Sequence, residues 1–254
     1  MTAQGSFAAL ARDGGRGALV TVVRGVHTGR RLLVRAGGAT EGGLGDPELD
    51  ARARAAAEAL MWTERSELRG DLFVDVVAPP PRLLIFGAVE YASHLSHLAR
   101  AMRWRPYVID PRSRFATAAR FPDAVEVVVA WPGEALEHLG GIDPATYLAV
   151  LTHDPKIDDE VLTLALAARP GPAYIGAMGS RRAQAQRRER LLAAGVAEAE
   201  LRRVSAPIGL DLGALGAEEI ALAIMAEAVA VRRGREGGRL ARRDAAGAGA
   251  GAAS

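Results

Sequence analysis

The chain has 254 residues, enough for one large domain or two small ones, and 49% of them are hydrophobic, which is ample for a packed core. It contains no cysteine, which excludes disulfides, thiolate metal sites and cysteine nucleophiles. The formal net charge is only +2 and no basic block is interleaved with aromatic residues, so the composition argues against nucleic-acid binding.

The N-terminal segment 1–15 lacks a charged region followed by a sustained apolar core, so no signal peptide is expected. No apolar run approaches the ~18 residues that span a bilayer, and the most apolar stretch, 218–231, is interrupted by Glu227. We therefore expect a soluble, cytoplasmic protein without a membrane partner.

A small α+β domain is predicted for residues 1–78. Two β-rich runs, 17–25 and 30–37, are separated by a turn and predict a hairpin. A helix is expected over 46–62, where an aspartate precedes a proline, and a strand over 71–77. A homodimer contact through this hairpin domain is one option, which the sequence leaves open.

The proline-rich segment 78–82 can be neither helix nor central strand, because proline lacks an N–H donor and fixes φ, so we place the domain boundary after residue 78. Beyond it, apolar strands alternate with helices, a pattern typical of a parallel sheet covered on both faces. Right-handed crossovers then give a doubly wound, Rossmann-like α/β fold for residues 79–234.

Residues 235–254 lack a core-forming face, and a disordered tail is expected there. The strands are expected at 82–88, 105–110, 125–131, 146–154, 173–178 and 202–207, and the helices at 91–104, 112–121, 133–139, 156–168, from 180 and at 217–233.

In doubly wound sheets, ligands bind beyond the carboxyl ends of the strands, so the loops there form the candidate site. The first such loop, 87–92, resembles the glycine-rich loop that binds dinucleotides, but Val89 stands at the position of its second glycine. A valine side chain there would obstruct a pyrophosphate, so NAD(P) binding is disfavoured. The alternative is a tight strand-to-helix turn with Gly87 as its pivot.

Polar residues follow the second and the fourth strand of this sheet. Asp110 stands where an acidic residue would meet a ribose 2′-OH, and Arg112 and Arg114 could bind a phosphate; an Asp–Pro turn with solvated arginines is the alternative. His153 either contacts a ligand or carries a proton, or it is a structural histidine. Asp154 is expected to cap the helix that follows.

The stretch GAMGSRR follows the fifth strand. Gly176 and Gly179 permit backbone conformations that a Cβ would forbid, and Ser180 can cap the helix that begins there. The free N–H groups at that helix end, together with Arg181 and Arg182, predict an anion pocket that suits a phosphate-bearing ligand. A capped helix with solvated arginines is the alternative.

Asp211 lies in a glycine-rich loop before the final helix, and it either meets the same cleft or serves as a turn residue. His94 and His97 share one helix face, but no third ligand is evident, so no metal site is expected. No catalytic residue is assigned. The candidate cofactor-binding residues are Gly87, Asp110, Arg112, His153, Gly176, Gly179, Ser180, Arg181, Arg182 and Asp211.

Several of these stretches, taken in order, resemble the xanthine dehydrogenase accessory factor family (XdhC/CoxI). The resemblance covers residues 80 to about 234, with a weaker likeness in the first domain. Any one stretch alone would be a weak signal, but their order along the chain is specific. They are IDPRSRFATAARFPDAVEVVVAWP at 109–132, LTHDPKIDD at 151–159, YIGAMGSRR at 174–182 and APIGLDLGALGAEEIALAIMAEAVAVRRG at 206–234.

The resemblance implies an accessory protein rather than a conventional dehydrogenase. Such factors bind molybdenum cofactor and assist its sulfuration and its insertion into molybdenum hydroxylases, which include xanthine dehydrogenase and carbon monoxide dehydrogenase. The cofactor is a pyranopterin with a phosphate, which suits arginines at a helix N-terminus. The implied partners are a molybdenum hydroxylase client and a sulfur donor protein.

Two departures from the family pattern bear on this function. Many members carry a Ser-Gly-Gly-Cys motif in the first domain, where the corresponding region of this chain, 41–50, reads EGGLGDPELD. Many also have Gly-Ala-Gly-His where this chain has Gly-Ala-Val-Glu at 87–90. Without cysteine, no thiolate of this chain can hold molybdenum or carry sulfur. Sulfur must then come from a partner, or this branch only carries the cofactor.

Two other functions stay open at this point. A nicotinamide-dependent oxidoreductase would use the Rossmann-like fold and Asp110, and micromolar binding of NAD(H) or NADP(H) would favour it. A scaffold would contact a molybdenum enzyme without holding cofactor, and binding of the partner alone would favour that function.

Overall fold

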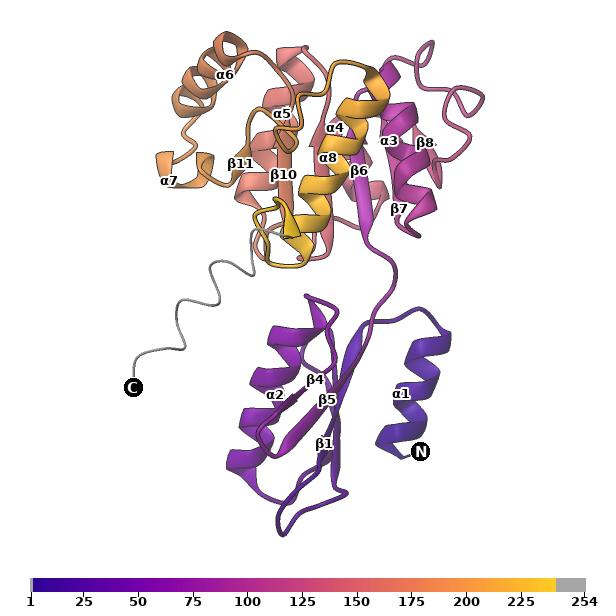
Figure 1. Cartoon of the computed structure of the whole chain (residues 1–254), viewed down its shortest axis with the longest axis vertical. Helices are drawn as coiled ribbons and strands as arrows, with labels where there is room; N and C mark the ends of the chain where they lie inside the picture. The colour runs from indigo at the N-terminus through magenta and orange to yellow at the C-terminus, as the bar shows by residue number, and fades with distance from the viewer. Residues whose placement is uncertain (1, 241–254) are drawn as a thin grey trace. The chain divides into compact units, whose positions relative to one another are not determined.

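The computed structural model describes residues 2–240, and the chain divides into two units, residues 1–80 and 81–254 (Figure 1). The proline-rich segment 78–82 lies at this division. The tail expected from residue 235 lies, from residue 241 onward, outside the described residues. None of the helices within the described part has the length and apolar character needed to cross a membrane.

The first unit is a five-stranded antiparallel sheet with the strand order β3-β2-β1-β5-β4. Strands β1 and β2 form the predicted hairpin, in which Gly17 lies opposite Arg35. The structure also contains helix α1 and the short edge strands β3 and β4, which were not predicted from the sequence. The elements are α1 (Ala3–Arg12), β1 (Gly17–Val22), β2 (Arg31–Arg35), β3 (Thr40–Gly43), α2 (Pro47–Met61), β4 (Glu67–Arg69) and β5 (Leu72–Val77).

Both faces of this sheet are covered, because successive side chains of a strand point to opposite sides. In β1, Val20 packs in the core under α2, whereas Leu19 packs against Phe7 of α1. Leu44 belongs to the core under α2 and is fully buried. It follows Gly42 and Gly43, so this pair of glycines leads directly into a core residue.

The second unit is a six-stranded parallel sheet with the strand order β11-β10-β9-β6-β7-β8. This order reverses direction between β6 and β9, which is the switch point of a Rossmann-like fold. The predicted α/β fold is therefore confirmed. The elements are β6 (Arg82–Phe86), α3 (Glu90–Ala101), β7 (Arg105–Ile109), β8 (Glu126–Val128), α4 (Pro132–His138), β9 (Thr146–Val150), α5 (Pro155–Ala167), β10 (Tyr174–Ala177), α6 (Arg181–Ala193), α7 (Glu198–Leu201), β11 (Val204–Ser205) and α8 (Ala217–Arg232).

Each face of the parallel sheet is buried under helices. Leu83 and Ile85 of β6 pack on the side of α3 and α8, which lie side by side in Figure 1. Leu84 and Phe86 of the same strand pack on the opposite side, with α4 and α5. Strands buried on both faces read as continuous apolar runs, which is why the sequence showed them clearly.

The short helix expected over 112–121 is wrong, because this segment is a series of turns. The side chain of Arg120 donates hydrogen bonds to the carbonyl oxygens of Phe115 (2.7 Å) and Ala88 (3.1 Å). The Phe115 carbonyl thus accepts hydrogen bonds from this side chain and from the Thr117 N–H (3.2 Å), and not from an N–H group four residues further on as in a helix. The segment forms a folded loop beyond the carboxyl end of β7.

Candidate functional site

All ten candidate residues belong to the second unit and lie at or beyond the carboxyl ends of its parallel strands. Because parallel strands end at one edge of the sheet, these residues share that edge. Gly87 follows β6, Asp110 and Arg112 follow β7, His153 follows β9, Gly176 is within β10, Gly179 and Ser180 follow β10, Arg181 and Arg182 begin α6, and Asp211 follows β11.

Gly87 is the pivot between β6 and α3. Its φ of +116° lies in a region that favours glycine, and a Cβ there would come within 2.6 Å of the Thr152 Cγ2 atom. Because Gly87 has no side chain, the turn after β6 can pack against Thr152, just beyond the end of β9. Val89 is the N-cap residue of α3 and makes no side-chain capping bond.

Asp110 is fully buried and saturated with hydrogen bonds. Its carboxylate accepts from the backbone N–H of Ala88 (2.8 Å) and from the backbone N–H of Arg112 (2.9 Å). The Arg112 guanidinium adds two more bonds, at 2.8 and 2.7 Å. Burial alone would raise the pKa of Asp110, but these hydrogen bonds outweigh it and hold the pKa below its ordinary value. Both oxygens are engaged, so Asp110 joins the loops after β6 and β7.

The pH dependence of stability tests this role of Asp110. Its folded-state pKa lies below the ~3.9 of an unfolded aspartate, so its contribution is complete above that value and is lost as the pH falls through the folded-state pKa. We expect Asp110→Asn to lower the free energy of unfolding by about 1–3 kcal/mol at pH 7. Urea unfolding should show this difference shrinking as the pH approaches 2.

The exposed Asp211 provides the matched control, because Asp211→Asn lies in the same unit and should change stability little at either pH. If Asp110→Asn lowers the free energy of unfolding by the same amount at pH 7 and at pH 2, the ionised Asp110 carboxylate does not stabilise the fold as proposed.

His153 and Asp154 lie in the loop between β9 and α5. The Asp154 side chain accepts a hydrogen bond from the backbone N–H of Lys156 (3.0 Å), which confirms the predicted helix cap. His153 is exposed, and no hydrogen-bond partner for its ring occurs within residues 2–240. The carboxylate of Asp110 and, to a lesser extent, that of Asp154 raise the pKa of Arg112, so the loop after β9 lies near enough to Arg112 for the two charges to interact.

The glycine corner after β10 combines close packing with an unusual backbone. A Cβ on Gly176 would come within 2.4 Å of both Ile208 Cγ1 and Tyr174 Oη, so this glycine lets the loop after β11 pack onto the sheet. Gly179 has a φ of +141°, which favours glycine. Ser180 caps α6 by accepting a hydrogen bond from the backbone N–H of Ala183 (3.3 Å).

The carbonyl groups of this corner are bound by side chains of α6. Gln184 Nε2 donates to the oxygens of Ala177 (3.0 Å) and Gly179 (3.3 Å), and Arg187 donates to the oxygen of Met178 (2.9 Å). Within residues 2–240, the four successive backbone N–H groups of residues 179–182 meet no acceptor. Unpaired N–H groups at a helix N-terminus attract anions.

Sequence reasoning missed a buried ionic network behind this corner. Arg187 Nη2 lies 2.7 Å from Asp158 Oδ2, and both side chains are at least 95% buried. The hydroxyl of Thr152 donates to the other oxygen of Asp158. Burial raises the pKa of Asp158, and the bonds from Thr152 and Arg187 only partly offset it. The sequence does carry one sign of this network. Asp158 stands beside Ile157 among the apolar residues that α5 buries, and a carboxylate at such a position needs a buried partner.

A cavity of about 430 Å³ adjoins the start of α6. Arg181 and Asp211 both line it, together with the loop 207–214 and part of α8. Glu227 of α8 holds this loop, because its carboxylate accepts from the Gly209 N–H (2.7 Å) and from the Tyr174 hydroxyl. Burial and the nearby Glu227 carboxylate raise the pKa of Tyr174. Glu227, which interrupts the apolar pattern of the last helix in the sequence, thus fixes the position of the loop 207–214.

The two histidines of α3 have separate partners. His94 Nε2 lies 3.7 Å from Glu218 Oε1, and His97 Nδ1 lies 3.0 Å from Asp123 Oδ2. Across residues 2–240, no three histidine, aspartate or glutamate side chains gather in an arrangement that could hold a metal ion.

Comparisons with known proteins agree with this fold. A protein of Bacillus subtilis (strain 168) that is named as a probable xanthine dehydrogenase subunit is 30% identical over 163 residues, 64% of this chain and 46% of that protein. The molybdenum cofactor insertion chaperone PaoD of Escherichia coli (strain K12) is 28% identical over 158 residues, 62% of this chain and 42% of that protein. This chain therefore spans less than half the length of these two curated relatives.

A crystal structure of a protein named as a xanthine dehydrogenase from Bacillus halodurans shares the fold. It has a TM-score of 0.59 and 23% sequence identity, and the match covers 90% of this chain and 63% of that one. Residues 83–228, more than half of the chain, match the family model described as the XdhC Rossmann domain. The resemblance seen in the motifs is thereby confirmed, and the chain belongs to the XdhC family.

Proposed function

We propose that this protein is an accessory factor that binds molybdenum cofactor and passes it to a molybdenum hydroxylase. The corner between β10 and α6 carries this proposal, because four successive N–H groups at residues 179–182 have no acceptor within the described residues. The names of two relatives, a molybdenum cofactor insertion chaperone and a probable xanthine dehydrogenase subunit, supply the cargo and the class of client.

The corner suits the phosphate of the cofactor. Backbone N–H groups at a helix N-terminus and a guanidinium group are the donors that bind phosphate in proteins. Arg181 brings such a group to the wall of the 430 Å³ cavity, which is of the size that holds small organic ligands. The chain has no cysteine, so sulfur for the cofactor would come from a partner protein.

A nicotinamide-dependent oxidoreductase is the second candidate, since the strand order is that of dinucleotide-binding sheets. Two observations disfavour it. Val89 stands where a dinucleotide loop needs glycine, and both carboxylate oxygens of Asp110 are engaged by its own chain.

Titration with molybdopterin tests the proposal. Each charge-assisted hydrogen bond to a buried phosphate contributes about 1.5–3 kcal/mol, so Arg181→Ala and Arg182→Ala should each weaken binding by roughly 10- to 100-fold. Tryptophan fluorescence would report the binding constant.

The exposed Arg202 lies at the end of α7, away from this corner, and Arg202→Ala is the matched control. Parallel titrations with NADH and NADPH separate the two candidates. Micromolar affinity for a nicotinamide nucleotide with no response to molybdopterin would replace the proposed function by the second one.

A further inference from the structure

Strand β8 forms one end of the parallel sheet, and within residues 2–240 it pairs only with β7. The backbone groups on its other side therefore have no strand partner in this part of the chain. An unpaired edge of this kind can add another strand through main-chain hydrogen bonds. Proteins usually protect such edges with charged residues, prolines or very short strands, so the residues at each edge show whether it is protected.

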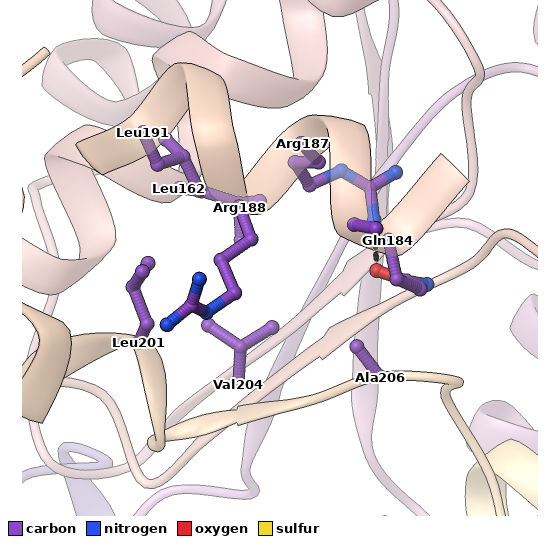
Figure 2. A pocket seen from close by; sticks show the side chains of 9 residues that line it. Leu162, Gln184, Arg187, Arg188, Leu191, Leu201, Val204 and Ala206 are labelled. Carbon is purple, nitrogen blue, oxygen red and sulfur yellow. Dashed lines mark hydrogen bonds between the residues drawn. The ribbon is translucent and has the colours of Figure 1, made fainter. Parts of the chain in front are cut away.

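The three other sheet edges among the described residues are protected. Strand β4 carries Glu67 in ion pairs with two arginines, and β3 reads Thr-Glu-Gly-Gly, without an apolar side chain. Strand β11 has only two residues, and the side chains of Leu201 and Arg188 lie beside its Val204 (Figure 2). None of these three edges offers a row of apolar side chains to a further strand.

The edge at β8 lacks this protection. Segment 125–131 reads VEVVVAW and contains one charged residue, Glu126, whose Oε1 atom lies 2.7 Å from His138 Nε2 of α4. Val125 and Val129, which flank the strand, are 42% and 49% exposed. Covering these side chains with other apolar side chains would stabilise an assembly.

The backbone of β8 shows which residues could pair with a further strand. The Asp110 N–H donates to the Val128 carbonyl oxygen (3.1 Å), so this carbonyl faces β7. Backbone groups of successive strand residues face opposite ways, so the N–H and C=O groups of Val127 both face outward. The Val129 N–H belongs to the same trans peptide unit as the Val128 carbonyl, and it also faces outward.

We propose that this edge pairs with the same edge of a second copy of the chain, antiparallel and centred on Val127. Two opposite residues in an antiparallel pair exchange both of their N–H···O bonds, so Val127 of one copy satisfies Val127 of the other. In this register the exposed Val125 of each copy lies opposite the exposed Val129 of the other, on the same face of the sheet. This self-complementarity specifies a second copy, and a twofold axis closes the assembly at a dimer.

The charges at this edge are compatible with the pairing. Glu126 of each copy would lie opposite Val128 of the other, so no carboxylate stands directly opposite another carboxylate. Each Glu126 also keeps the ion pair with His138 of its own chain. The pairing uses neither the corner between β10 and α6 nor the cavity beside it, so it does not depend on the proposed function.

Analytical ultracentrifugation of the chain tests the pairing, and we expect a monomer–dimer equilibrium. Val127→Pro removes the outward N–H of each copy and keeps an apolar side chain, so it should weaken the dimer roughly tenfold or more. Val129→Glu and Val125→Lys should each weaken it as well, because each places a charge opposite a valine. In Val125→Lys/Val129→Glu, opposite charges face each other across the two copies, so the affinity should recover.

Val26→Lys is the control, because Val26 is an exposed valine in the turn between β1 and β2 of the first unit, and its replacement should leave the dimer unchanged. Hydrogen exchange measured by nuclear magnetic resonance adds a direct readout, since the N–H groups of Val127 and Val129 should exchange more slowly as the dimer forms. A chain that stays monomeric at millimolar concentration would overturn the proposal. So would a dimer that Val127→Pro leaves intact, or a double variant that associates no better than the single variants.

Discussion

Replacing Arg187 with methionine is expected to lower the free energy of unfolding by about 3–5 kcal/mol. Arg187 and Asp158 are both buried, so removing the arginine leaves a carboxylate without its partner in a medium of low polarity. The Met178 carbonyl also loses its donor. Urea unfolding followed by circular dichroism would measure the loss.

A double-mutant cycle distinguishes this pair from simple packing. Because replacing both charges by apolar side chains removes the uncompensated group, Arg187→Met/Asp158→Leu should be less destabilised than the sum of the two single variants. Arg188→Met is the control on the same helix, since Arg188 is half exposed and its pair with Glu198 should contribute at most about 1 kcal/mol. Strict additivity of the two single variants would contradict the proposed ion pair.

Replacing Gly87 with alanine is expected to lower the free energy of unfolding by about 2–6 kcal/mol. One part is the strain of a side chain at a φ of +116°, roughly 1–3 kcal/mol. The other part is overpacking against Thr152, whose Cγ2 would lie 2.6 Å from the new Cβ, also about 1–3 kcal/mol. Thermal unfolding monitored by circular dichroism would show the combined loss.

Gly195 separates these two contributions. Its φ is +88°, but no atom lies within 4 Å of the position of a Cβ, so Gly195→Ala should show only the strain. Thr152→Ser removes the Cγ2 atom and keeps the hydroxyl that binds Asp158, so it should recover part of the loss in Gly87→Ala. Equal losses at Gly87 and Gly195, with no recovery in the Thr152→Ser background, would show that the contact with Thr152 is unimportant.

The parallel sheet could be predicted because its strands are buried on both faces and its helices are long. Runs such as residues 83–86 of β6 therefore appear as unbroken apolar segments. The edge strands β3 and β4 could not be predicted in this way. Strand β3 reads Thr-Glu-Gly-Gly and has no apolar pattern, because its register depends on pairing with β2 rather than on burial.

The candidate site was only partly visible in the sequence. The glycines at 176 and 179 and the cap at Ser180 mark a strand-to-helix corner through local backbone chemistry. The roles of Gln184 and Arg187 depend on which face of α6 meets the sheet. Helix α6 is polar almost throughout, so no apolar stripe identifies that face, and Arg187 cannot be told from its exposed arginine neighbours.

The burial of Leu44 determines what a cysteine would meet in this part of the first unit. A cysteine introduced there would lie under α2 with no surface reachable by solvent, as the leucine does now. Such a thiol would stay protonated and unreactive in apolar surroundings. Thiol chemistry at this position would therefore require helix α2 or its flanking loop to be remodelled, and a single substitution would not provide it.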